Sequence, residues 1–137
     1  MKNIKYLLLV LTFITSFKIN AQEVKLSNNK VLVDKVARFN FDKKELGDSF
    51  SLYKLDSKEE IIYMALNRNG TQHFQDDDYK RFTFIENNVT IESSRLKFKS
   101  WKSIIELLLE EKILNLDGKI DSVNLEKFKS KYNDLRN

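Results

Sequence analysis

Cysteine and proline are both absent from this chain of 137 residues, which has only three glycines and one histidine. Without cysteine the chain can form no disulfide and has no thiol nucleophile. No serine stands in the Gly-x-Ser-x-Gly elbow of a serine hydrolase, no glycine-rich loop would cradle a phosphate, and a lone histidine excludes paired-histidine metal sites. These absences leave binding, or catalysis through acidic residues, as the functions to weigh.

Acidic residues are also missing from residues 1–21, which contain three lysines. Tyr6 to Phe17 is a run of apolar and small hydroxyl residues, and it is shorter than the ~20 residues that a membrane-spanning helix needs. With Ala21 as a small residue for cleavage, this pattern is typical of a secretory signal peptide. We therefore expect residues 1–21 to be cleaved and residues 22–137 to form a single secreted or periplasmic domain without a membrane anchor.

Positive charge is modest once that leader is set aside. Its removal takes away three of the 24 basic residues and none of the 20 acidic ones, which leaves a net charge of about +1. Phosphate-backbone binding depends on a surplus of basic charge on one face, so we expect no nucleic-acid partner. No cofactor motif is present, and we expect no cofactor.

Alternation of apolar and polar residues predicts strands over most of residues 23–94. In the segment 60–66 neither face is polar, which predicts a central strand covered on both sides. Asn87-Asn88 joins the last two segments as a tight hairpin. The expected strands are 24–26, 30–41 with a bulge or bend at 34–36, 50–55, 60–66, 79–86 and 89–93.

The period then changes to that of a helix. Ser100 is the expected N-cap of a helix over 101–112, and a second helix is expected to begin at Asp121 or Ser122. Strands first and helices last indicate an α+β fold. We expect an antiparallel sheet of about five or six strands followed by two C-terminal helices packed on one face.

This C-terminal portion resembles that of small exported bacterial proteins with no assigned biochemistry. The resemblance covers about a quarter of the chain beyond the leader, and it implies a shared fold with no functional residue to carry over. It is carried by the leader ending in Ala21-Gln22, the helix after Ser100, Leu114, Asp117-Gly118-Lys119-Ile120, and a second helix with Phe128 and Tyr132.

A candidate binding loop contains His73, Asp76, Asp77, Asp78 and Tyr79. One imidazole and three carboxylates can hold a divalent ion, and a histidine beside a carboxylate can act as a general base. However, neighbouring side chains in a strand point to opposite faces, so consecutive carboxylates do not all reach one centre. The alternative is a solvated loop tip, and we assign no catalytic, cofactor-binding or metal residue.

A second candidate is the junction between the last strand and the first helix, where basic and aromatic residues interleave. Such a stretch can contact an acidic partner or a glycan. In the alternative, it is a junction whose aromatic side chains face the core. The residues concerned are Arg95, Lys97, Phe98, Lys99, Trp101 and Lys102.

Taken together, the sequence favours a non-enzymatic exported binding or interaction protein that uses an exposed sheet face or the His73 loop. Its partner would be an unknown protein or glycan outside the cytoplasm. Two alternatives stay open: a small secreted hydrolase that uses acidic residues, and a periplasmic inhibitor or immunity protein. An enzyme should show a pocket where titratable groups converge, whereas a binding module should show an apolar patch or groove.

Overall fold

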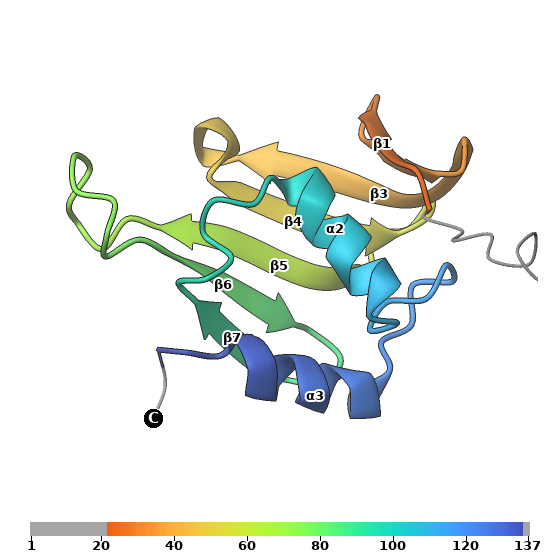
Figure 1. Cartoon of the computed structure of the whole chain (residues 1–137). Coiled ribbons are helices and arrows are strands. Elements are labelled where there is room, and N and C mark those ends of the chain that lie inside the picture. The colour runs from red at the N-terminus through yellow and green to blue at the C-terminus, as the bar shows by residue number, and fades with distance from the viewer. Residues whose placement is uncertain (1–21, 136–137) are drawn as a thin grey trace, which may run out of the picture.

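One antiparallel sheet of seven strands dominates the computed structural model, which describes residues 22–135 (Figure 1). Each strand pairs with the next one along the chain, and two helices follow the sheet. The predicted α+β class is confirmed, with seven strands in place of five or six. The elements are β1 (Val24–Ser27), β2 (Lys30–Val33), β3 (Val36–Lys44), the 3-10 turn η1 (Glu45–Gly47), β4 (Ser49–Lys54), β5 (Glu60–Asn67), β6 (Tyr79–Phe84), β7 (Val89–Ser93), α2 (Trp101–Glu110) and α3 (Ser122–Tyr132). The predicted signal peptide lies outside the described residues.

The seventh strand comes from a hairpin in the segment 30–41, which the sequence predicted to be one strand. Val33 pairs with Val36 across a two-residue turn. Asp34 and Lys35 have φ of 50° and 69°, the left-handed values that tight hairpin turns require. The predicted bulge or bend is therefore wrong, because the chain reverses here although neither turn residue is glycine.

Both helices begin where the sequence predicted. The Ser100 side chain accepts a hydrogen bond from the Ser103 amide, and the Asp121 side chain accepts one from the Asn124 amide. Each cap satisfies an amide that has no partner within its helix. The first helix ends at Glu110, two residues before the predicted end.

The residues after α3 protect the outer edge of β7. The Asn133 side chain accepts from the Glu92 amide at 2.9 Å, and the Asp134 side chain accepts from the Ser94 amide at 2.9 Å. The Asp134 amide in turn donates to the Glu92 carbonyl. An unpaired edge strand is a template for association with other chains, and these bonds occupy it.

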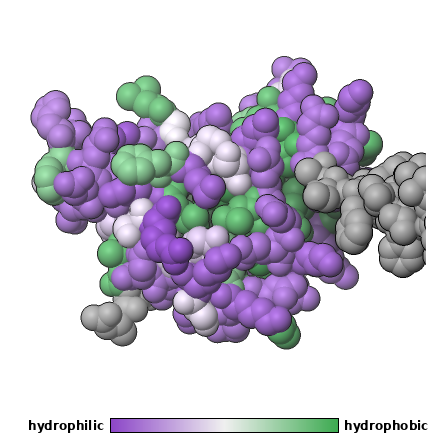
Figure 2. Space-filling model, viewed as in Figure 1, coloured by the Kyte–Doolittle hydropathy of each residue, from purple (hydrophilic) through white to green (hydrophobic). Residues whose placement is uncertain are grey.

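The core lies between the helices and one face of the sheet. α2 packs towards the β1 side and α3 towards the β7 side (Figure 1). Phe128 on α3 meets Phe82 edge-on, with ring centroids 6.4 Å apart, and both rings are fully buried. Figure 2 shows that the surface on the helix side is mainly hydrophilic, with hydrophobic residues showing through near the centre of the view. Two rows of paired residues run across the sheet beneath the helices: Phe50, Met64, Phe82 and Ile91, and beside them Leu52, Ile62, Phe84 and Val89.

Strand β5 is central but is not covered on both sides. Ile61 and Ile62 are both buried because the register shifts opposite them, and Ile61 packs against the turn at Gly118. A Cβ at Gly118 would lie 3.0 Å from the Ile61 side chain, and its φ of +82° also favours glycine. Tyr63, in contrast, is 36% exposed on the far face, so the prediction of cover on both sides is wrong.

The far face of the sheet is polar. Within residues 22–135, both helices pack on the opposite face (Figure 1), and no helix is long and apolar enough to cross a bilayer. One row across the far face consists of Ser51, Tyr63, Thr83 and Thr90.

Candidate functional site

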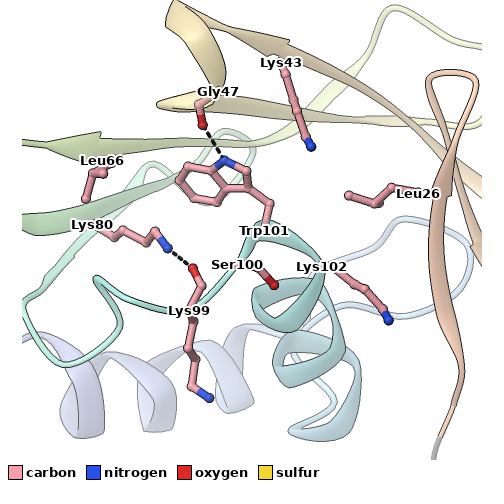
Figure 3. A pocket seen from close by; sticks show the side chains of 9 residues that line it. All are labelled: Leu26, Lys43, Gly47, Leu66, Lys80, Lys99, Ser100, Trp101 and Lys102. Carbon is pink, nitrogen blue, oxygen red and sulfur yellow. Dashed lines mark hydrogen bonds between the residues drawn. The ribbon is translucent and has the colours of Figure 1, made fainter.

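A cavity of about 270 Å³ opens where the first turn of α2 meets the sheet (Figure 3). Strands β1, β3, β5 and β6, the turn η1 and the start of α2 each contribute to its wall. Three of its residues are apolar and four are lysines, and no acidic residue lines it among residues 22–135. The lining residues are Leu26, Lys43, Gly47, Leu66, Lys80, Lys99, Ser100, Trp101 and Lys102.

The indole of Trp101 is fixed at the centre of this wall. Its Nε1 donates a hydrogen bond to the Gly47 carbonyl at 2.8 Å, which joins the start of α2 to η1 (Figure 3). The ring also packs against Phe50, with centroids 5.9 Å apart, and the residue is only 8% exposed. Trp101 therefore presents a rigid aromatic surface to the cavity.

The turn that receives this hydrogen bond has a strained backbone. Glu45 and Leu46 have φ of 53° and 56°, and Gly47 has φ of +91°. Left-handed geometry costs a residue other than glycine ~1–2 kcal/mol. The turn is held beyond its C-terminal end by Asp48, whose carboxylate forms two 2.9 Å bonds to the Arg68 guanidinium. That guanidinium, through its hydrogen bonds, keeps the pKa of Asp48 below its ordinary value.

Lys80 is the most unusual residue of the cavity. It lies on β6 in alternation with the core residues Phe82 and Phe84, and it is only 4% exposed. Its ammonium donates to the Lys99 carbonyl and lies 4.6 Å from the centroid of the Trp101 ring. Burial, followed by the positive charge of Lys99, lowers the pKa of Lys80 from 10.5 to about 8. The side chain is thus charged at neutral pH in a place that disfavours charge.

The other three lysines surround the cavity with exposed positive charge. Figure 3 shows the Lys43 ammonium directed towards the space in front of Trp101. Leu26 lies across that space from the indole. The side chains of Lys99 and Lys102 extend away from the indole. Lys102 lies 3.7 Å from Glu106 one helical turn later. This carboxylate is outside the lining, so the cavity itself keeps a positive potential.

Comparison with known proteins does not assign the chain to a family. No protein-family model, curated protein or solved structure matches it. The resemblance to small exported bacterial proteins therefore stays a prediction. The interpretation of the cavity rests on the geometry of this chain.

The predicted loop around His73 does not bring its polar side chains to one centre. The Asp77 carboxylate accepts from the Thr71 hydroxyl at 2.8 Å, whereas Asp78 is buried and one of its oxygens has no hydrogen-bond partner. His73 and Asp76 are exposed. Within residues 22–135, no group of three or more histidine or acidic side chains is placed to hold a metal ion.

The junction of basic and aromatic residues before α2 matches each of the two sequence interpretations in part. Trp101 faces the core, as the structural alternative predicted, whereas Phe98 is 77% exposed. Lys99, Trp101 and Lys102 also line the cavity, so this stretch supplies part of a candidate site. The sequence interpretation missed Lys43 and Lys80. A signal was present, since each lysine continues an alternating run of aromatic residues on the inner face of the sheet.

Proposed function

We propose that the chain is an exported, non-enzymatic binding protein and that the lysine-lined cavity holds a small anionic ligand. The observation that carries the proposal is the composition of the wall, with four lysines and no acidic residue among those described. Lys80 takes part in none of the ion pairs formed within residues 22–135. A buried positive charge is costly, and an anion bound in the same cavity would lower that cost by Coulomb attraction.

Electrostatics favour an anion in this place for a second reason. The charge of Lys99 contributes to the lowered pKa of Lys80, which means that the two ammonium groups repel each other. An anion bound in the cavity would be attracted by both ammonium groups and would offset part of that repulsion.

A hydrolase is less well supported by the same residues. The cavity lining offers no carboxylate to act as acid or base. Ser93 pairs with Lys80 across β6 and β7, but its hydroxyl is buried without a hydrogen-bond partner. A serine nucleophile activated by lysine needs a hydrogen bond between the two groups. An inhibitor of a protein would use a broad surface, whereas a cavity of this size suits a small molecule.

The proposal can be tested by fluorescence, because Trp101 is the only tryptophan in the sequence and lines the cavity. Sodium acetate, sulfate and phosphate should each be titrated into the purified protein at constant ionic strength. We expect a saturable change in emission, at least tenfold weaker in affinity in Lys43→Met and unchanged in Lys127→Met, which alters an exposed lysine on α3. Responses that do not saturate for any anion, hexanoate included, would contradict the proposal.

A further inference from the structure

We infer that the ligand is a small amphiphilic acid, with one carboxylate head and an unbranched or aromatic apolar body. This inference rests on the proposed function and names the class of anion. A site for a bare inorganic anion would be lined by polar donors on all sides. Here the walls formed by Leu26, Leu66 and Trp101 are apolar, and the charged groups are lysine side chains at their margins.

The side chains of the cavity define one region for the apolar body of the ligand and another for its carboxylate head. Figure 3 shows Leu26 and the Trp101 indole on two sides of one space, with the Lys43 ammonium directed into it. An apolar body between Leu26 and Trp101 would remove both surfaces from water. Its carboxylate would then lie near Lys43 and the first turn of α2.

The start of α2 is suited to receive that head group. The helix has ten residues, and its first turn contains no acidic side chain that would complement the positive end of the helix dipole. Ser100, its N-cap, and Lys102 both line the cavity. The Ser103 amide is already bound by the Ser100 side chain, so the attraction here comes from the other first-turn amides and from the lysine charges next to them.

The volume limits the size of the ligand. The cavity has a volume of about 270 Å³, just below that of pockets that hold drug-sized ligands. Drug-sized ligands occupy pockets of roughly 300–1,000 Å³. A six-carbon fatty acid such as hexanoate, or an arylacetate of similar size, fills the space, whereas acetate leaves most of it to water.

Hexanoate, acetate, hexan-1-ol and inorganic phosphate form the set of probes for the test, with binding followed by Trp101 emission and by calorimetry. Burying one methylene group strengthens binding about fourfold. If two of the four methylenes that hexanoate adds are buried, hexanoate should bind more than tenfold more tightly than acetate. Hexan-1-ol has the same body without the charge and should bind at least tenfold more weakly than hexanoate.

Two variants test the assigned regions separately. Leu26→Ala should weaken hexanoate binding at least fourfold and leave acetate unchanged, with Leu55→Ala, an exposed leucine in the β4–β5 turn, as the matched control. Lys43→Met should weaken hexanoate at least tenfold and leave hexan-1-ol unchanged. Thermal melts check that each variant is folded. Because Lys43 is exposed, its replacement leaves the core intact.

The outcomes distinguish this inference from the proposal on which it rests. Acetate or phosphate binding as tightly as hexanoate would overturn the amphiphilic class and leave anion binding standing. Hexan-1-ol binding as tightly as hexanoate would show that the lysines do not select charge, and the proposed function would fall as well. Tighter binding of hexanoate, lost in both variants, is the result we expect.

Discussion

Replacing Lys80 by methionine should make the protein more stable. Methionine keeps most of the volume and flexibility of lysine but carries no charge to be desolvated. The pKa of Lys80 falls from 10.5 to about 8 on folding, a difference of about 2.5 units. At 1.36 kcal/mol per unit, the charged side chain destabilises the fold by ~3 kcal/mol at neutral pH. Loss of the hydrogen bond to the Lys99 carbonyl offsets ~1 kcal/mol, which leaves a gain of ~2 kcal/mol.

The pH dependence of that gain has a defined sign. Because the pKa of Lys80 is lower in the folded state, the unfolded chain binds more protons between about pH 8 and pH 10.5, and stability rises with pH across this window. The cost is fully present below about pH 8 and disappears towards pH 10.5. Lys43, Lys99 and Lys102 line the same cavity and are retained in both proteins. The difference between wild type and Lys80→Met therefore isolates the one side chain.

Urea denaturation followed by Trp101 fluorescence measures this difference. At pH 7 the unfolding free energy of Lys80→Met should exceed that of the wild type by ~2 kcal/mol, and at pH 10 by much less. Lys102→Met, which removes a side chain that is 52% exposed, should change stability by less than ~0.5 kcal/mol. A Lys80→Met protein less stable than the wild type at pH 7, or a difference that does not shrink with rising pH, would contradict the expected desolvation cost of Lys80.

Three further changes test other contacts. Ser100→Ala removes the N-cap of α2 and should lower the unfolding free energy by ~1 kcal/mol in urea melts, with Ser130→Ala as a control on the exposed side of α3. Phe128→Ala leaves a cavity beneath α3 and should cost ~3–5 kcal/mol, or ~10 °C or more in a thermal melt. Asp48→Asn weakens the bidentate pair with Arg68 and should lower the unfolding free energy by ~1 kcal/mol at pH 7. The pKa of Asp48 is below 3.8 in the folded protein, so the difference between wild type and variant should vanish as acid protonates this carboxylate.

Much of the fold could be predicted because local chemistry and the tertiary structure agree. The last hairpin is an example, since Phe82 and Phe84 alternate with polar residues and Asn88 has a φ of 50° in the turn that follows. The helix caps at Ser100 and Asp121 were equally visible. The turn at Asp34-Lys35 was not, because it lacks glycine and asparagine and is imposed by pairing between β2 and β3.

The site was harder to predict because its residues come together only through the sheet. Lys43 and Lys80 are neighbours of Trp101 in space but are far from it in sequence, and β4 and β5 separate the strands that carry them. Hydrophobic periodicity assigns both lysines to the inner face. Lysine is so rarely buried that the pattern alone gives no reason to place either ammonium group beside the core. Only the structure shows that the cavity beside α2 makes room for their charges.

Two local costs to stability meet at the lysine-lined cavity. Glu45 and Leu46 adopt left-handed backbone angles in the turn whose Gly47 carbonyl receives Trp101, and Lys80 carries a buried charge over the same indole. An apolar residue at position 80 would remove the second cost without disturbing the rows of the core. Local choices that oppose stability are expected where a protein binds or reacts. Their coincidence at a wall with four lysines is the reason to seek the ligand there and not at the His73 loop, where the Asp77 carboxylate is bound by the Thr71 hydroxyl and Asp78 is buried.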